Sequence, residues 1–214
     1  MEFGLSEEQE LLQNSARDFL TRECPTTLVR EMIDTTEGYS PELYTKIAAM
    51  GWNGMVIPER LQGMGLSMLD MALLAEEVGR AVVPGPLYTS VLAGMCLNAT
   101  TATAQKKQWL PQLATGERIL TLGLLEEGER LDADGITTRY SVRKNGHYVL
   151  DGTKLFVADA HIADGIIAPF RDPTAEHEEG ISLFLIPADT PGLSVITLES
   201  IDQTRRPCEM TCRG

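Results

Sequence analysis

The residues that could do metal or thiol chemistry are few and widely separated along this chain. They are Cys24, Cys96, Cys208, Cys212, His147, His161 and His177. The cysteines lack the Cys-x-x-Cys spacing of a structural zinc site, and the histidines lie far from one another in the sequence. We therefore expect buried or incidental thiols and no metal site.

An acidic pair, Glu126 and Glu127, opens the segment EEGERLDADG at residues 126–135. Carboxylates at the end of a strand can contact a bound cofactor or substrate. The same sequence is also typical of a solvated surface turn. The residues alone leave both interpretations open.

The composition is that of an ordinary soluble protein, with 214 residues, 43% hydrophobic content and a formal net charge of -13. Such a charge repels a phosphate backbone, and no basic cluster is longer than Arg205-Arg206, so we expect no nucleic-acid partner. The first residues are acidic, unlike a signal or transit peptide. The apolar stretch 91–97 is shorter than the roughly 20 residues of a membrane span. We expect a cytoplasmic protein without a membrane partner.

Five helices are predicted in the first half, where capping residues precede apolar side chains three and four positions apart. Ser6 with Gln9, and Ser67 with Asp70, have the spacing of a capping box. The predicted helices begin near Ser6, Ser40, Ser67, Leu87 and Thr103.

From Arg118 onward the apolar period shortens to two, which indicates strands. Asn145-Gly146 and Asp151-Gly152 are typical of tight turns between neighbouring strands. The acidic segment 171–180 is expected to form an exposed loop. Strands are predicted over residues 120–125, 137–143, 148–150, 154–157, 165–170, 181–186 and 193–198.

Helices followed by strands favour an α+β fold with two segregated domains. We expect an all-helical amino-terminal domain over residues 1–117 and a β domain over residues 118–214. The period does not specify how the strands pair.

Four phrases in residues 41–87 occur together in a recognisable order and spacing. They are Met50-Gly51-Trp52, Ile57-Pro58-Glu59, Gln62-Gly63-Met64-Gly65 and Glu76-Glu77-Val78-Gly79-Arg80. With them, this stretch resembles the amino-terminal domain of the acyl-CoA dehydrogenases. Residues 105–116, 150–164 and 204–207 are similar to later segments of the same family. The resemblance implies that the β domain is a small barrel that binds FAD and an acyl-CoA thioester.

The family resemblance also implies a reaction. Acyl-CoA dehydrogenases are FAD-dependent oxidoreductases of fatty acid and lipid metabolism, in which a carboxylate removes the α-proton and the flavin takes hydride from the β-carbon. In the family the base is a Glu of a carboxy-terminal helical domain, and no residue at or before Gly214 corresponds to it. We therefore expect a fragment that lacks this domain, carries no catalytic residue of its own and is inactive alone.

The resemblance places the flavin contacts in two segments. The family pattern LTEPGAGSD aligns with residues 124–132, where Leu125 and Leu131 replace hydroxyl side chains and Arg130 replaces a glycine. In the second segment Ala158 stands where the family has Thr or Ser. The implied cofactor-binding residues are Leu124, Leu125, Arg130, Leu131, Phe156, Val157 and Ala158. Flavin binding is expected to persist but to be weakened.

Two other functions fit the same residues. The lost hydroxyls would suit a non-catalytic, flavin-poor subunit of a mixed acyl-CoA dehydrogenase oligomer. A stand-alone acyl-thioester-binding module without a redox role is the other alternative. The family resemblance also implies a homo- or hetero-oligomer with other acyl-CoA dehydrogenase chains.

Overall fold

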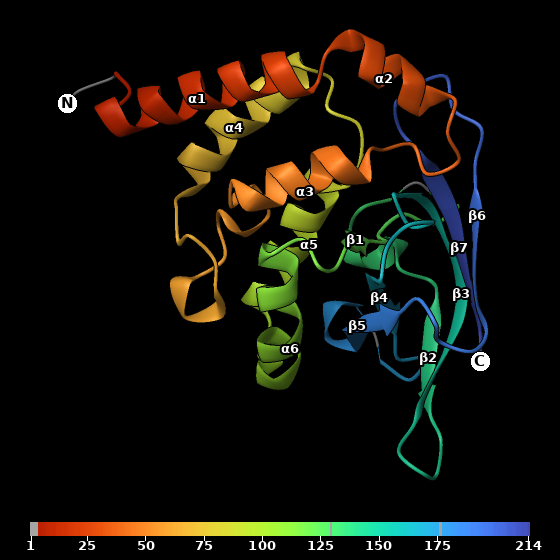
Figure 1. Cartoon of the computed structure of the whole chain (residues 1–214). Helices are drawn as coiled ribbons and strands as arrows, with labels where there is room; N and C mark the ends of the chain where they lie inside the picture. The colour runs from red at the N-terminus through yellow and green to blue at the C-terminus, as the bar shows by residue number, and fades with distance from the viewer. Residues whose placement is uncertain (1–3, 129, 176) are drawn as a thin grey trace. The chain divides into compact units, whose positions relative to one another are not determined.

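The computed structural model describes residues 4–128, 130–175 and 177–214. By its internal contacts the chain divides into two compact units, Met1–Glu117 and Arg118–Gly214. Figure 1 shows helices in the first and strands in the second. The predicted fold class, a helical domain followed by a β domain, is therefore confirmed, and the β domain is a curled half-barrel rather than a closed one.

Side-chain caps begin the helices at Ser6, Ser40 and Ser67 as the sequence predicts, whereas the helices that start at Leu87 and Thr103 have none. The side chain of Ser6 accepts from Gln9 and that of Ser67 accepts from Asp70, and both capping boxes are complete. Helix α2 was not predicted, because its N-cap is Pro25, which offers no side-chain hydrogen bond. The helices described are α1 (Glu7–Glu23), α2 (Thr26–Ile33), α3 (Pro41–Ala49), α4 (Met68–Arg80), α5 (Leu87–Ala99) and α6 (Thr103–Ala114).

Trp52 is central to the core of the helical unit. It lies in a short 3-10 helix, Trp52–Gly54, directly after α3, and Phe19 of α1 packs edge-on against it with ring centroids 5.2 Å apart. Leu20, Ile47 and Leu74 bring α1, α3 and α4 into the same buried cluster. Such burial contributes about 1.5–3 kcal/mol for each large apolar side chain.

Glu77 ties α1 to α4, which lie side by side in Figure 1. Its buried carboxylate accepts from Arg17 Nε at 3.0 Å and from Arg80 Nε at 2.8 Å. The hydrogen bond from Arg17 is the main cause that holds the pKa of Glu77 below its usual value, with Arg80 helping and burial opposing. A carboxyl with a lowered pKa stabilises the fold above its unfolded value of about 4.5, and this contribution is lost as the pH falls through the folded value.

We expect Glu77→Gln to make stability depend less on pH in the acid range. Between pH 7 and pH 3 the melting temperature of the wild type should fall by about 3 °C more than that of the variant. Circular dichroism at 222 nm measures both transitions. The control is Glu76→Gln, which changes an exposed neighbour on the same helix. An equal acid response in wild type and Glu77→Gln would contradict the assignment.

Two glycines of the helical unit should respond oppositely to alanine. A Cβ on Gly63 would lie 2.0 Å from the carbonyl oxygen of Ile57, whereas a Cβ on Gly79, within α4, would meet nothing within 4 Å. We expect Gly63→Ala to cost about 1–3 kcal/mol. Gly79→Ala should add about 0.5–1 kcal/mol, because alanine favours the helix. Urea unfolding of both variants measures the two effects, and shifts of the same sign would refute this reading.

The β unit forms one strongly curled sheet from seven described strands (Figure 1). The strand order is β1-β4-β2-β3-β7-β6, and β5 also pairs with β4. Phe170, Met210 and Ile186 contribute to its buried cluster. The strands are β1 (Leu120–Leu122), β2 (Arg139–Val142), β3 (Tyr148–Ala158), β4 (Gly165–Arg171), β5 (Ile181–Pro187), β6 (Leu193–Thr197) and β7 (Pro207–Arg213).

One turn prediction was wrong and one strand was missed. Asp151-Gly152 is not a turn but the middle of the continuous strand β3, where Gly152 adopts φ 133° and pairs with Cys212 of β7. Strand β7 was not predicted at all. The turn at Asn145-Gly146 is confirmed, because Gly146 has φ 81° between β2 and β3.

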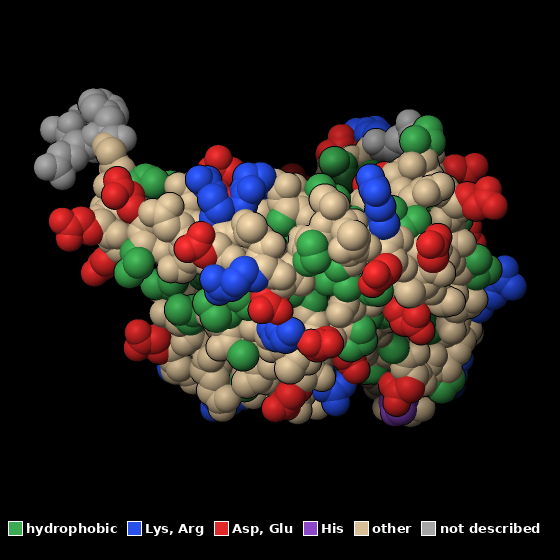
Figure 2. All heavy atoms as spheres, turned by 45° about the horizontal axis from the view of Figure 1, so that its top comes forward, with side chains coloured by type: hydrophobic (Ala, Val, Ile, Leu, Met, Phe, Trp, Pro, Cys, Tyr) green, Lys and Arg blue, Asp and Glu red, His purple; other side chains and the backbone are tan. Residues whose placement is uncertain are grey.

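The surface carries both signs of charge. Figure 2 shows acidic and basic side chains interspersed on the face in view, with hydrophobic side chains between them. Helices long and apolar enough to cross a membrane are absent from the described residues.

Candidate functional site

The two segments expected to contact the flavin are joined by a backbone hydrogen bond. The amide of Leu155, in β3, donates to the carbonyl of Leu125 at 2.8 Å, which forms an isolated antiparallel bridge. A second tie lies nearby, where the hydroxyl of Thr121 donates to the carbonyl of Ala158 at 2.6 Å. The structure therefore brings β1 and the chain after it against the last residues of β3, although the bridged leucines are thirty positions apart.

A β-bulge shapes β3 at this place. Lys154 pairs with Met210 and Val157 with Cys208, so β3 has one residue more than β7 between these pairs. Phe156 lies within the bulge at φ 53°, a left-handed conformation that costs a bulky residue about 1–3 kcal/mol. Val157 is buried, whereas 58% of Phe156 is exposed. The bulge thus presents a large aromatic ring to the surface beside the bridge.

The loop that carries Arg130 and Leu131 follows the bridged segment, and Glu129, in the same stretch, lies outside the described residues. Arg130 turns toward its own loop, with Nε donating to Asp132 Oδ1 at 2.9 Å and a longer ion pair to Asp134 at 3.5 Å. The hydrogen bond from Arg130 is the leading cause that lowers the pKa of Asp132. Leu131 is 75% exposed. Neither residue takes part in the bridge to β3.

Glu126 is buried, so its interpretation as a solvated turn residue is wrong, whereas Glu127 is exposed. Oε1 of Glu126 accepts from Lys154 Nζ at 2.6 Å. Burial alone would raise the pKa of Glu126, but hydrogen bonds from Lys154 and Thr137 outweigh it and lower the pKa. For Lys154, burial lowers the pKa while Glu126 opposes that change. Lys154 was not predicted as a site residue. A charged residue within a predicted strand is the sequence feature that could have identified it.

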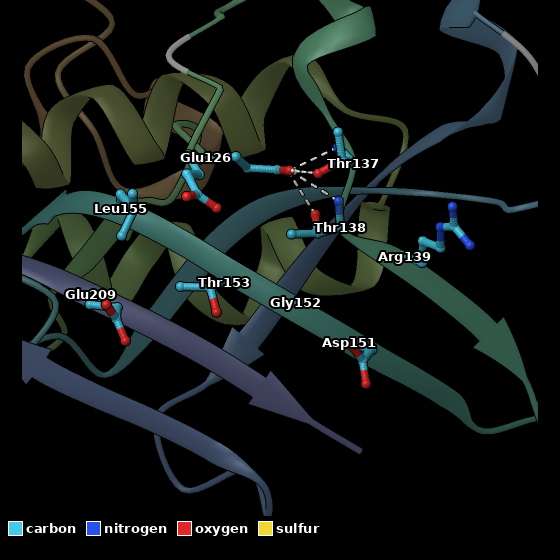
Figure 3. Close-up of a pocket in the computed structure, with 10 residues that line it drawn as sticks. Glu126, Thr137, Thr138, Arg139, Asp151, Gly152, Thr153, Leu155 and Glu209 are labelled. Atoms are coloured by element: carbon cyan, nitrogen blue, oxygen red, sulfur yellow. Dashed lines mark hydrogen bonds between the residues drawn. The ribbon is translucent and has the colours of Figure 1, made fainter.

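A half-open cavity of about 700 Å³ lies beside this ion pair (Figure 3). Glu127, Asp151 and Glu209 place carboxylates along it, against the guanidinium of Arg139. An excess of carboxylates repels phosphate groups, so we do not assign this cavity to a pyrophosphate. Its lining residues are Glu126, Glu127, Thr137, Thr138, Arg139, Asp151, Gly152, Thr153, Leu155 and Glu209.

The cysteine thiols do not form a second candidate site in the described residues. The four cysteines are free, and Cys24, Cys208 and Cys212 are buried. Burial raises the pKa of Cys212 to about 11, which keeps it a thiol at neutral pH. Within the described ranges, no three His, Cys, Asp or Glu residues are grouped to hold a metal ion.

Two family descriptions match the chain. They are "Acyl-CoA dehydrogenase, N-terminal domain" over residues 6–117 and "Acyl-CoA dehydrogenase, middle domain" over residues 121–210. The chain is 29% identical over 194 residues to the mitochondrial isobutyryl-CoA dehydrogenase of Dictyostelium discoideum, covering 89% of the chain and 46% of that protein. It is 31% identical over 198 residues to acyl-CoA dehydrogenase FadE29 of Mycobacterium tuberculosis, covering 91% and 50%.

Solved structures agree with these matches. Glutaryl-CoA dehydrogenase from Mycobacterium smegmatis superposes with a TM-score of 0.83 at 26% identity, covering 98% of this chain and 54% of the other. The Tcur3481-Tcur3483 steroid ACAD gives 0.85 at 28% identity, covering 100% and 56%. The chain spans about half the length of the curated relatives it matches.

Proposed function

The chain belongs to the acyl-CoA dehydrogenase family, and from this premise we propose that it carries the flavin-facing part of an FAD-dependent enzyme that introduces an α,β double bond into an acyl-CoA thioester. One observation carries the proposal. The Leu125–Leu155 bridge joins the two segments that align with the family's flavin contacts, beside the exposed ring of Phe156. An exposed aromatic ring on a strained backbone is typical of a ligand-binding surface.

The residues present fit a flavin ring better by apolar contact than by hydrogen bonds. We assign stacking contact to Phe156 and apolar contact to Leu124, of which 41% is exposed. Leu125 and Ala158 offer no side-chain donor, so backbone groups must serve the polar edge of the ring. Bound FAD would accept hydride from the substrate. We assign no catalytic base to this chain.

The substrate class follows from the relatives. Their names include isobutyryl-CoA and glutaryl-CoA dehydrogenases, which supports an acyl-CoA thioester as the substrate. Oligomers with like or related chains of the family are part of the same proposal.

A flavin-poor subunit of a mixed oligomer is the second candidate. The replacement of hydroxyl side chains by Leu125 and Leu131 favours it, because each lost hydrogen bond weakens cofactor binding by about 1 kcal/mol. A stand-alone acyl-thioester-binding module is the third, and it would bind thioester without flavin.

Three measurements on the purified protein separate the candidates: the flavin absorbance, the binding of added acyl-CoA and the capture of a second chain of the family. A flavin spectrum at one FAD per chain, with bleaching when acyl-CoA is added without oxygen to the holoprotein, supports the first. A colourless protein that binds neither added FAD nor acyl-CoA but captures a second chain of the family supports the second. Binding of acyl-CoA without FAD supports the third, and it excludes the proposed function.

A further inference from the structure

The buried ion pair between Glu126 and Lys154 lies next to the bridge, one residue away from it in each of the two segments. Glu126 follows the bridged Leu125, and Lys154 precedes the bridged Leu155. We propose that Glu126 and Lys154 are positioning residues that hold the two flavin-facing segments in register. This inference rests on the proposed function and deepens it, because it concerns how the same site is kept in shape.

The carboxylate of Glu126 is fully occupied by the protein itself. Oε1 accepts from Lys154 Nζ at 2.6 Å and from Thr138 Oγ1 at 2.8 Å. Oε2 accepts from the amide and hydroxyl of Thr137 at 2.8 and 2.6 Å, and from the amide of Thr138 at 3.1 Å. Five donors leave this carboxylate no capacity for a ligand. Its role is therefore to join segments of the protein.

Three segments meet at this carboxylate. Figure 3 shows Glu126 pointing toward Thr137 and Thr138, the two residues that directly precede β2. Lys154 reaches the same group from β3, and its side chain is 1% exposed. The chain after β1 is thus fixed to both neighbouring segments by side chains. The backbone contributes the bridge between Leu125 and Leu155.

The bulge of β3 begins directly after Lys154. Phe156 holds a left-handed backbone conformation, which persists only where the surrounding structure over-determines it. Lys154 fixes the bulge on one side through Glu126. On the other side the amide of Asp159 donates to the carbonyl of Arg206 at 3.1 Å. Loss of the ion pair would release the first of these two anchors.

The ion pair contributes more to specifying one arrangement of the two segments than to the free energy of unfolding. Removing two charges from water offsets most of their attraction, and well-packed apolar residues would do as well for stability. The charged pair instead requires one arrangement, because the ammonium group must meet the carboxylate. Lys154 Nζ also lies 5.2 Å from the ring centroid of Phe170, which packs beneath it in β4.

Hydrogen exchange of the Leu155 amide tests the inference in protein without FAD. In Lys154→Met, which leaves the four threonine donors to Glu126, we expect this amide to exchange about tenfold faster. The reference is the amide of Arg213, which donates to Gly192 at the far end of β7. Glu126→Gln should accelerate the Leu155, Thr137 and Thr138 amides together. An unchanged Leu155 amide in folded Lys154→Met, or equal acceleration at Arg213, would overturn the proposal.

FAD titration then connects the pair to the cofactor. Lys154→Met and Glu126→Gln should each raise the Kd for FAD about tenfold. Glu77→Gln, a like change of a buried and paired carboxylate in the helical unit, should leave it unchanged. If wild type binds FAD and Lys154→Met binds it equally well, the positioning role is refuted while the proposed function stands. If wild type does not bind FAD but the Leu155 amide responds, the two residues hold the segments and the proposed function fails.

Discussion

Replacing Phe170 by alanine is expected to lower the free energy of unfolding of the β domain by about 3–5 kcal/mol. Phe170 lies in β4 with 0% of its surface exposed. Its ring packs edge-on against Phe184, with centroids 5.8 Å apart, and lies under the ammonium group of Lys154. Alanine would leave a cavity there and remove the aromatic face that the buried cation contacts. Chemical unfolding monitored by circular dichroism measures the change.

Phe156→Ala is the matched control, because it removes the same side chain from the same domain. More than half of Phe156 is exposed, so we expect less than about 1 kcal/mol of destabilisation. Its effect should appear instead in the Kd for FAD, which is expected to rise about tenfold. Equal destabilisation by the two variants would show that Phe156 is a packing residue and not a cofactor contact.

Restoring the two lost hydroxyls should strengthen flavin binding. In Leu125→Thr/Leu131→Ser, two new hydrogen bonds of about 1 kcal/mol each would lower the Kd for FAD roughly thirtyfold. Arg130 can stay, because its guanidinium is already bound by Asp132 and Asp134. The bridge can stay as well, since Leu125 contributes only its carbonyl to it. Titration of FAD against the absorbance of the protein measures the gain.

Leu124→Thr provides the control for this prediction. It adds a hydroxyl one residue earlier, on a side chain that is also partly exposed, and should not tighten FAD binding. A double variant that binds FAD no better than wild type would argue that the segment 124–131 does not reach the cofactor. The flavin-poor subunit would then become the better account of this chain.

Local sequence rules predicted most of the helical unit, because its signals are local. The capping boxes at Ser6 and Ser67 and the cap at Ser40 all mark helix starts in the structure. Strand β7 was missed although Cys208, Met210 and Cys212 alternate in it as buried residues, which is a local period-two signal. The continuity of β3 through Gly152 depends instead on a distant partner, because Gly152 pairs with Cys212 of β7.

The candidate site also combines local and tertiary information. The family resemblance selects the segments around Leu125 and Phe156 as candidate flavin contacts, but the contact of these segments through the Leu155 amide depends on the tertiary fold. Burial of Lys154 could not be predicted from its residue type, since lysine is almost never fully buried without a partner. That partner, Glu126, lies 28 positions earlier in the chain.

The bulge in β3 also determines which changes of length this strand tolerates. Cys208 and Met210 are two residues apart in β7 and both side chains are buried. Their partners Val157 and Lys154 are three apart, which in a regular strand would place them on opposite faces. The additional residue shifts the alternation by one and directs both inward. Deleting residue 155 or 156 would leave these two partners two apart, so a regular strand would still direct both inward, and β3 would lose only its bulge.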